Sequence, residues 1–341
     1  MSKANRKPDP SGPPAQATSR VVAIVKLAIA GLVICAIAFT IAVVDRDGSV
    51  SETQADIFDT AFGPKPNQVR FNEALESMGH TEPQVFDLNG NNVYFSVQYE
   101  DQNPGDVMRR YQEAFVRRGL NDKVYNTLEE AAGDEGLKTR LTGGITPVKV
   151  GADRIVMGGM MTRNIALHPD DLRGDLMAVD DMELFRGHRW IEIFRQSGSD
   201  RTTVLAAWSD DDFSYEKMLP SDERLAEGRS VDPDVPSCPG CTRVNHFADK
   251  NDPGGYRSNI FVTNMGHHQM VDFYRQAMQR RGWSETEFQR AHEKIRQAVE
   301  YDGDAMEKLR FEKHERNLEI FVFPLEQGEI AVQTVLWEQL D

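Results

Sequence analysis

The chain has little positive charge and few cysteines for its length. Its 341 residues contain 39 Lys and Arg against 54 Asp and Glu, a formal net charge of -15. A nucleic-acid-binding protein needs a clustered basic surface to neutralise phosphates, so this balance argues against nucleic acid as a partner. The three cysteines are Cys35, Cys238 and Cys241, which leaves one closely spaced pair.

The motifs of the common catalytic sites are also missing. The sequence has no GxSxG elbow, no Walker loop, no HExxH and no GxGxxG after a strand pattern. Its histidines have no paired nucleophile. The triplet Asp210, Asp211 and Asp212 lacks the spacing and the glycine of a calcium loop, and we interpret it as a solvated turn. We therefore expect no catalytic residues, no metal site and no cofactor.

The longest apolar run extends from residue 21 to residue 44 and is interrupted only by Lys26. At about 1.5 Å per residue a helix of this length spans a bilayer. Basic residues precede it in a Pro- and Ser-rich segment, so the positive-inside rule places residues 1–20 in the cytoplasm as a disordered tail. A cleaved signal peptide is one alternative, with a poor cleavage site. A lipoprotein signal at Cys35 is the other, which Ile34 disfavours.

Two later segments repeat each other at a constant offset. They are VQYEDQNPGDVMRRYQEAFVRRGL from Val97 and IFVTNMGHHQMVDFYRQAMQRRGW from Ile260. In both, alternating apolar residues typical of a strand precede apolar residues at helical spacing, and a glycine then ends the helix. The repeated core positions are Tyr111, Ala114 and Gly119 in the first copy and Tyr274, Ala277, Gly282 and Trp283 in the second.

Further strand patterns complete the predicted fold. Alternating segments around turn residues predict hairpins over 190–209 and 318–338. The expected fold class is α+β, with a single N-terminal transmembrane helix followed by two tandem strand-helix-strand-strand repeats, each an antiparallel sheet with helices on one face. A small hairpin is predicted around Gly158 and Gly159. The capping box from Ser284 to Glu287 predicts the start of a long amphipathic helix.

This interpretation divides the chain into six parts. They are the basic tail 1–20, the transmembrane helix 21–44, a linker over 45–66, the first extracytoplasmic repeat 67–219 with an insertion near 143–188, a Pro-rich linker with a CPGC turn over 220–242, and the second extracytoplasmic repeat 243–341. The insertion includes Met157, Met160 and Met161, which predict apolar packing or an adhesive surface for a partner.

Cys238 and Cys241 flank a Pro-Gly pair in the second linker. Outside the cytoplasm disulfides persist, and the flanking prolines favour a structural disulfide that closes a turn. A redox centre of the thioredoxin type would need a helix start after the first cysteine. Zinc would need two more ligands, for which His246, His267 and His268 are available, but no second closely spaced pair exists. Haem attachment is excluded because Thr242 follows the second cysteine.

These features together predict a membrane-anchored, non-catalytic scaffold or binding protein of a bacterial envelope assembly. Residues 21–44 would lie in the inner membrane, and the two repeats would bind a protein partner in the periplasm. At the level of architecture this plan resembles the inner-membrane assembly platforms of pilus and type II secretion systems. The alternative is an extracytoplasmic thiol-disulfide oxidoreductase that uses Cys238 and Cys241.

Overall fold

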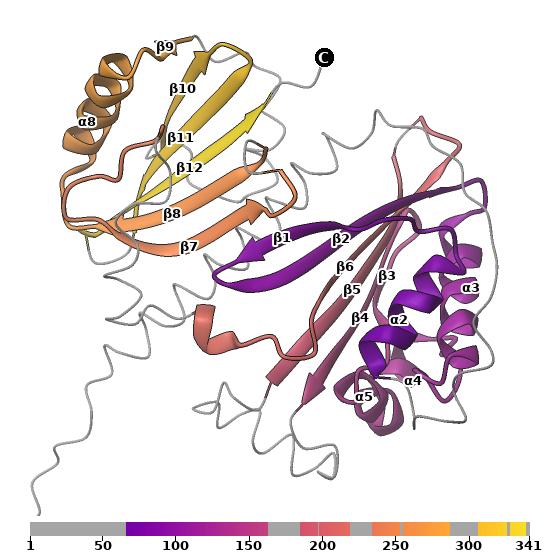
Figure 1. Ribbon diagram of the computed structural model, residues 1–341. Helices are drawn as coiled ribbons and strands as arrows, with labels where there is room; N and C mark the ends of the chain where they lie inside the picture. The colour runs from indigo at the N-terminus through magenta and orange to yellow at the C-terminus, as the bar shows by residue number, and fades with distance from the viewer. Residues whose placement is uncertain are drawn as a thin grey trace, which may run out of the picture. The chain divides into compact units, whose positions relative to one another are not determined.

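The computed structural model describes residues 66–162, 185–196, 198–218, 234–252, 255–286, 306–325 and 328–338 (Figure 1). The predicted basic tail, the apolar run 21–44 and nearly all of the linker 45–66 lie outside this part of the chain, as does most of the linker 220–242. No helix within the described residues is both long and apolar enough to cross a membrane.

The first half of the described chain contains helices and strands in mixed order. They are α2 (Asn67–Glu76), β1 (Gln84–Leu88), β2 (Asn91–Glu100), α3 (Pro104–Arg117), α4 (Leu128–Ala132), α5 (Asp134–Leu141), β3 (Thr146–Val150), β4 (Arg154–Thr162), β5 (Phe185–Arg195), β6 (Thr202–Ser209) and the 3-10 helix Tyr215–Met218. The second half has β7 (Thr242–Asp249), β8 (Arg257–Thr263), α8 (His267–Arg280), β9 (Ser284–Glu285), β10 (Glu307–Lys313), β11 (Arg316–Pro324) and β12 (Ile330–Glu338).

All twelve strands belong to one antiparallel sheet, so the prediction of two separate sheets is wrong. The strand order is β3-β4-β5-β6-β2-β1-β7-β8-β12-β11-β10-β9. The two halves join where β1 pairs with β7, with Asp87 opposite Ala248. An alternating pattern identifies a strand and its buried face but not its neighbour, and both halves offered a free edge that the other could cover.

Aromatic stacking and hydrogen bonds strengthen this junction. The rings of Phe86 and Phe247 stack with centroids 4.6 Å apart, and Phe95 meets both rings edge-on. The backbone N–H of Asn89 donates to the carbonyl of His246 at 2.9 Å, and the N–H of His246 donates to Oδ1 of Asn89 at 2.7 Å. The junction of β1 and β7 is therefore a packed interface as well as a backbone ladder.

Each half repeats the same strand order outward from this junction. The order is β1-β2-β6-β5-β4-β3 in one direction and β7-β8-β12-β11-β10-β9 in the other. Helices α3 and α8 follow the second strand of their halves. Within the described residues the two halves thus share one unit, which has two strands before the helix and four after it. The strand-helix-strand-strand unit was too small because β1 and β7 were not predicted.

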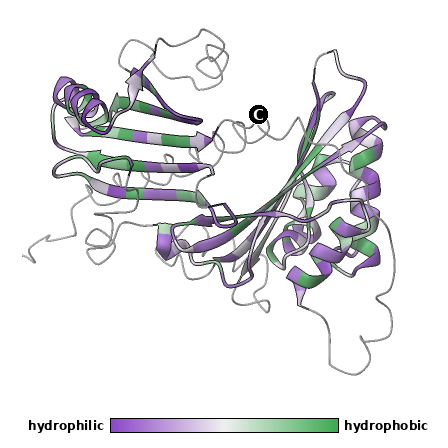
Figure 2. Ribbon diagram, turned by 45° about the horizontal axis from the view of Figure 1, so that its top comes forward, coloured by the Kyte–Doolittle hydropathy of each residue, from purple (hydrophilic) through white to green (hydrophobic). Residues whose placement is uncertain are grey.

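The helices cover one face of the sheet in each half (Figure 1). Tyr111 of α3 and Tyr274 of α8 are fully buried in the two hydrophobic cores. Gly119 and Gly282, just beyond the two helices, have φ of 67° and 79°, the left-handed conformation in which glycine is favoured. Along the strands apolar and polar residues alternate, as Figure 2 shows.

Two local predictions are also wrong. Gly158 and Gly159 do not form a turn but lie within the continuous strand β4. A Cβ on Gly159 would lie 1.9 Å from the carbonyl oxygen of Gly144, so glycine serves there for close backbone contact and not for chain reversal. The predicted helix start at Ser284 is wrong, because Ser284 pairs with Glu312 at the start of β9; the remainder of that predicted helix, beyond Thr286, lies outside the described residues.

Candidate interaction surface

Large apolar side chains are exposed near the free edge of the first half. Of five such side chains among the described residues, three lie on β3 and β5: Val148, Val150 and Trp190, which are 44%, 43% and 41% exposed. Val150 pairs with Ile155, whose side chain is in the core, so it points to the helix side of the sheet. We call the other two residues, Val148 and Trp190, the edge patch. A Cβ on Gly158, between β3 and β5, would lie 3.3 Å from Cγ2 of Val148 and 3.7 Å from Cε3 of Trp190. The valine and the tryptophan therefore flank the same glycine.

Strand alternation places Trp190 on the face away from the helices. Its neighbour Ile191 and the next alternate residue Ile193 are fully buried in the core beneath α2 and α3, so Trp190 points to the opposite face. Its partner on β4 is Gly158, which has no side chain to cover the indole ring. The sequence signal for this site is the pair Gly158 and Gly159 inside a strand pattern. In the sequence this pair predicts a hairpin turn, but the structure has a continuous strand there.

Charged groups border the edge patch. Nε of Arg154 and Oε1 of Glu192 form an ion pair at 2.6 Å, and Lys149 is exposed on β3. An apolar centre with a charged rim is the usual composition of a protein-binding surface. The backbone edge itself is poorly suited to adding another strand, because the pairing of β3 with β4 shifts register between Pro147 and Lys149. The exposed side chains, and not the backbone edge, are therefore the candidate contact surface here.

The Met-rich insertion contributes more to the core than to this surface. Met157 is fully buried in the first core, and Met160 is half-buried. The side chain of Met161 lies outside the described part.

In the acidic triplet, Asp212 is exposed in a turn as predicted, but Asp210 and Asp211 are not solvated. The carboxylate of Asp210 accepts hydrogen bonds from Nε2 of Gln68 at 2.6 Å, from Nδ2 of Asn92 at 2.8 Å and from the hydroxyl of Tyr94 at 2.8 Å. Burial, reinforced by Asp210, raises the pKa of Tyr94 to about 12. Asp211 pairs with the buried guanidinium of Arg189 at 2.8 Å. These carboxylates tie α2, β2, β5 and β6 together, and sequence spacing gave no sign of it.

A second buried polar group lies beneath α3. His80 is 5% exposed, its Nδ1 lies 2.9 Å from Oγ of Ser96, and its Nε2 lies 2.7 Å from the hydroxyl of Tyr111. Burial lowers the pKa of His80 to about 3, so the imidazole is neutral. Both of its nitrogens are already hydrogen-bonded inside the protein, so this set of residues orders the core.

Cys238 and Cys241 form a disulfide in the structure. Cys238 is 4% exposed and belongs to the second core, and the N–H of Cys241 donates to its carbonyl at 3.2 Å in a turn. The next element is strand β7, which begins at Thr242. Neither cysteine is at a helix start, the position that lowers a thiol pKa in redox centres. This geometry favours the structural interpretation of the pair.

The remaining predicted positions are core residues: Ala114 and Ala277 are buried beside the two tyrosines, and Trp283 is buried just beyond α8.

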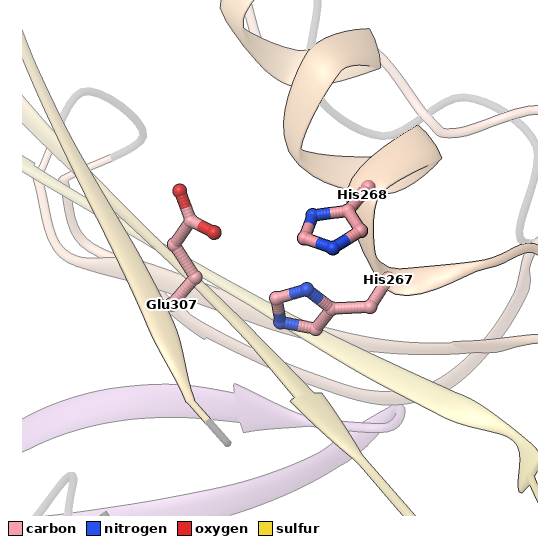
Figure 3. Close-up of side chains that lie close together, drawn as sticks. All are labelled: His267, His268 and Glu307. Carbon is pink, nitrogen blue, oxygen red and sulfur yellow. The ribbon is translucent and has the colours of Figure 1, made fainter. Parts of the chain in front are cut away.

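One group of three potential metal ligands comes together in the described part of the chain, namely His267, His268 and Glu307 (Figure 3).

Comparisons of the whole chain with protein-family models, with curated proteins and with solved structures gave no match.

Proposed function

We propose that this protein is a non-catalytic binding protein whose first half holds a protein partner through the edge patch. The observation that carries this proposal is the exposed indole of Trp190 beside Val148 over Gly158. Exposed tryptophan at the centre of an apolar patch is enriched among the residues that contribute most to protein binding. The ion pair of Arg154 with Glu192 supplies a polar rim.

Comparison of the two halves supports the proposal. The second half has the same strand order, but its outer strand β9 has only two residues, Ser284 and Glu285. Strands β10 and β11 there carry an ion pair between Lys308 and Glu319 at 3.3 Å. The same strand order therefore forms in the described residues of the second half without an edge patch, so the fold itself does not need these exposed apolar side chains. The edge patch belongs to the half that also contains α4 and α5 between its helix and its outer strands.

The sequence also supports a proposal for the compartment in which the protein binds its partner. The apolar run 21–44, with basic residues before it, would anchor the chain in a bacterial inner membrane and leave both halves outside the cytoplasm. A disulfide between Cys238 and Cys241 suits that compartment. A reporter active only outside the cytoplasm, fused after Asp341, should give signal, and a reporter active only in the cytoplasm should not. The reverse result would refute this placement.

The binding proposal is tested with Trp190→Glu and Val148→Glu. Both side chains are exposed, so the fold should be retained, while a charge in the patch should reduce binding. Val69→Glu is the matched control, because Val69 is 41% exposed on α2 of the same half. Proteins that crosslink to the parent chain in membranes are identified and then purified for a direct binding measurement.

The expected result is a loss of at least about tenfold in affinity for the patch variants, as for a residue central to binding, and none for the control. Equal affinity for all three variants would contradict the proposal. So would a patch variant that changes only self-association in analytical ultracentrifugation, since the occupant would then be a second copy of this chain.

A further inference from the structure

We infer that His267, His268 and Glu307 form a binding site for a divalent transition metal, with Zn²⁺ as the natural candidate. Each offers one ligand atom, and these atoms all lie within 4.8 Å of one another. Figure 3 shows the two imidazole rings side by side at the start of α8, with the carboxylate of Glu307 across from them. This set is independent of the edge patch and goes beyond the proposed binding function.

The topology explains why these three residues meet. His267 and His268 are the first two residues of α8, and Glu307 is the first residue of β10. Glu307 lies opposite Val322 in the pairing of β10 with β11. The carbonyl of Val322 in turn lies 3.3 Å from Nε2 of His267. Val322 is therefore the shared neighbour that brings the carboxylate of Glu307 and the imidazole of His267 to the same place on the sheet.

Surrounding hydrogen bonds prepare two of the three ligands. When Nε2 of His267 donates to the carbonyl of Val322, its proton is fixed on that nitrogen and Nδ1 keeps a free lone pair. Nη2 of Arg275 binds Oε1 of Glu307 at 3.1 Å, which orients the carboxylate and leaves its other oxygen for an ion. Metal-binding histidines and carboxylates are commonly held in this way by groups behind them.

The charges near the site are close to balanced. Arg275 also pairs with Glu285 through Nε at 3.1 Å, so its positive charge is shared between two carboxylates. The positive end of the α8 dipole opposes a cation, by about two- to fivefold in affinity where the helix end is exposed. The carboxylate of Glu307 acts in the favourable direction and is one of the ligands.

The ligand types select the class of metal. Two imidazole nitrogens and one carboxylate oxygen suit Zn²⁺ and its first-row neighbours, whereas Ca²⁺ and Mg²⁺ prefer oxygen alone. In a tetrahedral zinc site with bonds of about 2.0–2.2 Å, ligand atoms lie roughly 3.3 Å apart. The cluster therefore has to contract on binding. His268 is exposed and Glu307 is half-buried, so rotation of these two side chains can close it around the ion.

Zinc binding to the purified full-length chain tests the inference, with a chromophoric zinc indicator as competitor. His268→Ala is the principal variant, because the exposed ring can be removed with little effect on folding. Glu307→Gln keeps the shape of the carboxylate and removes its charge. His314→Asn is the matched control: His314 is exposed in a turn with φ of 55°, a conformation that Asn tolerates.

We expect the parent and His314→Asn to bind one Zn²⁺ with equal affinity. His268→Ala should lose at least about 100-fold and Glu307→Gln at least about tenfold. Zn²⁺ should also raise the melting temperature of the parent but not that of His268→Ala, because an ion that binds only the folded state stabilises it. No zinc binding by the parent, or undiminished binding by His268→Ala, would overturn the assignment, since any zinc would then be held elsewhere.

Discussion

Tyr111 and Tyr274 occupy the same place in the two halves but have different surroundings. Both are fully buried, one on α3 and the other on α8. The hydroxyl of Tyr111 lies 2.7 Å from Nε2 of His80. The hydroxyl of Tyr274 has no hydrogen-bond partner within the described structure. We therefore predict that the same substitution, Tyr to Phe, changes the free energy of unfolding in opposite directions at the two positions.

The magnitudes follow from what each hydroxyl leaves behind. Tyr111→Phe leaves Nε2 of His80 buried without its hydrogen-bond partner, which should lower the free energy of unfolding by about 1–3 kcal/mol. Tyr274→Phe removes a buried hydroxyl that is desolvated without compensation, so it should raise that free energy by about 1 kcal/mol. The aromatic ring stays in both variants, so neither value includes the large loss of a ring deletion.

Urea unfolding followed by tryptophan fluorescence measures both effects. Trp208 lies in the first core and Trp283 in the second, so each half contains an intrinsic probe. Because the two tyrosines lie in separate cores, the double variant should show the sum of the single effects within about 0.5 kcal/mol. Changes of the same sign and size in both single variants would refute the reasoning from hydrogen bonding.

Three further predictions concern stability. Asp211→Asn should lower the free energy of unfolding by about 3 kcal/mol, measured by urea unfolding, because the carboxylate of Asp211 pairs with an Arg189 side chain that is 1% exposed; a loss as small as that of the exposed Asp212→Asn would contradict this. Burial lowers the pKa of His80 from 6.5 to about 3, so below pH 6.5 the unfolded chain binds a proton there that the folded chain does not. The stability that neutral His80 allows is therefore fully present above pH 6.5, and the free energy of unfolding should fall by about 1.4 kcal/mol for each pH unit below it. His80→Gln should therefore reduce the slope of stability against pH between pH 6.5 and 4.5, while the similar contribution of His188, whose pKa burial lowers to about 4, remains; an unchanged slope would exclude His80 as a source. Gly159→Ala should lower the melting temperature by several degrees, because its Cβ would lie 1.9 Å from a backbone oxygen; an unchanged melting curve would refute the close contact.

The sequence predicted one helix in each half, α3 and α8, and the later hairpins of both halves, but not α2, α4 or α5. The apolar spacing around Tyr111 and Tyr274 identified α3 and α8, and each helix ends just before its glycine as expected. Strands β5 and β6 lie where the pattern over 190–209 placed them, as do β11 and β12 over 318–338. Local periodicity and helix caps carry this information, because both depend on residues that are close in sequence.

The neighbours of the strands could not be predicted in the same way. Strand β1 has only five residues, and β7 follows directly on the CPGC turn; no strand was predicted at either place. Their pairing joins residues far apart in the chain, and no local pattern records it. The proposed metal site could not be predicted for the same reason. The sequence shows that His267 and His268 are adjacent, but it does not show the sheet register that brings Glu307 close to them.

Polar residues at the ends of strands were misjudged for a related reason. A run of aspartates is usually solvated, and only the long-range contacts of Asp210 and Asp211 show that it is not so here. The spacing of residues in sequence gives the chemistry that is possible, and the fold decides which partners are present.

The arrangement of the sheet has a physical logic in the management of its edges. A single half would expose both β1 and its outermost strand, and an exposed strand edge promotes aggregation. Pairing β1 with β7 covers one edge of each half at once. Of the two edges that remain, β9 has only two residues, and β3 is interrupted by a register shift beside Pro147. Both are therefore poor templates for another strand. The exposed side chains of Val148 and Trp190, and not these backbone edges, are therefore where the proposed protein partner would bind.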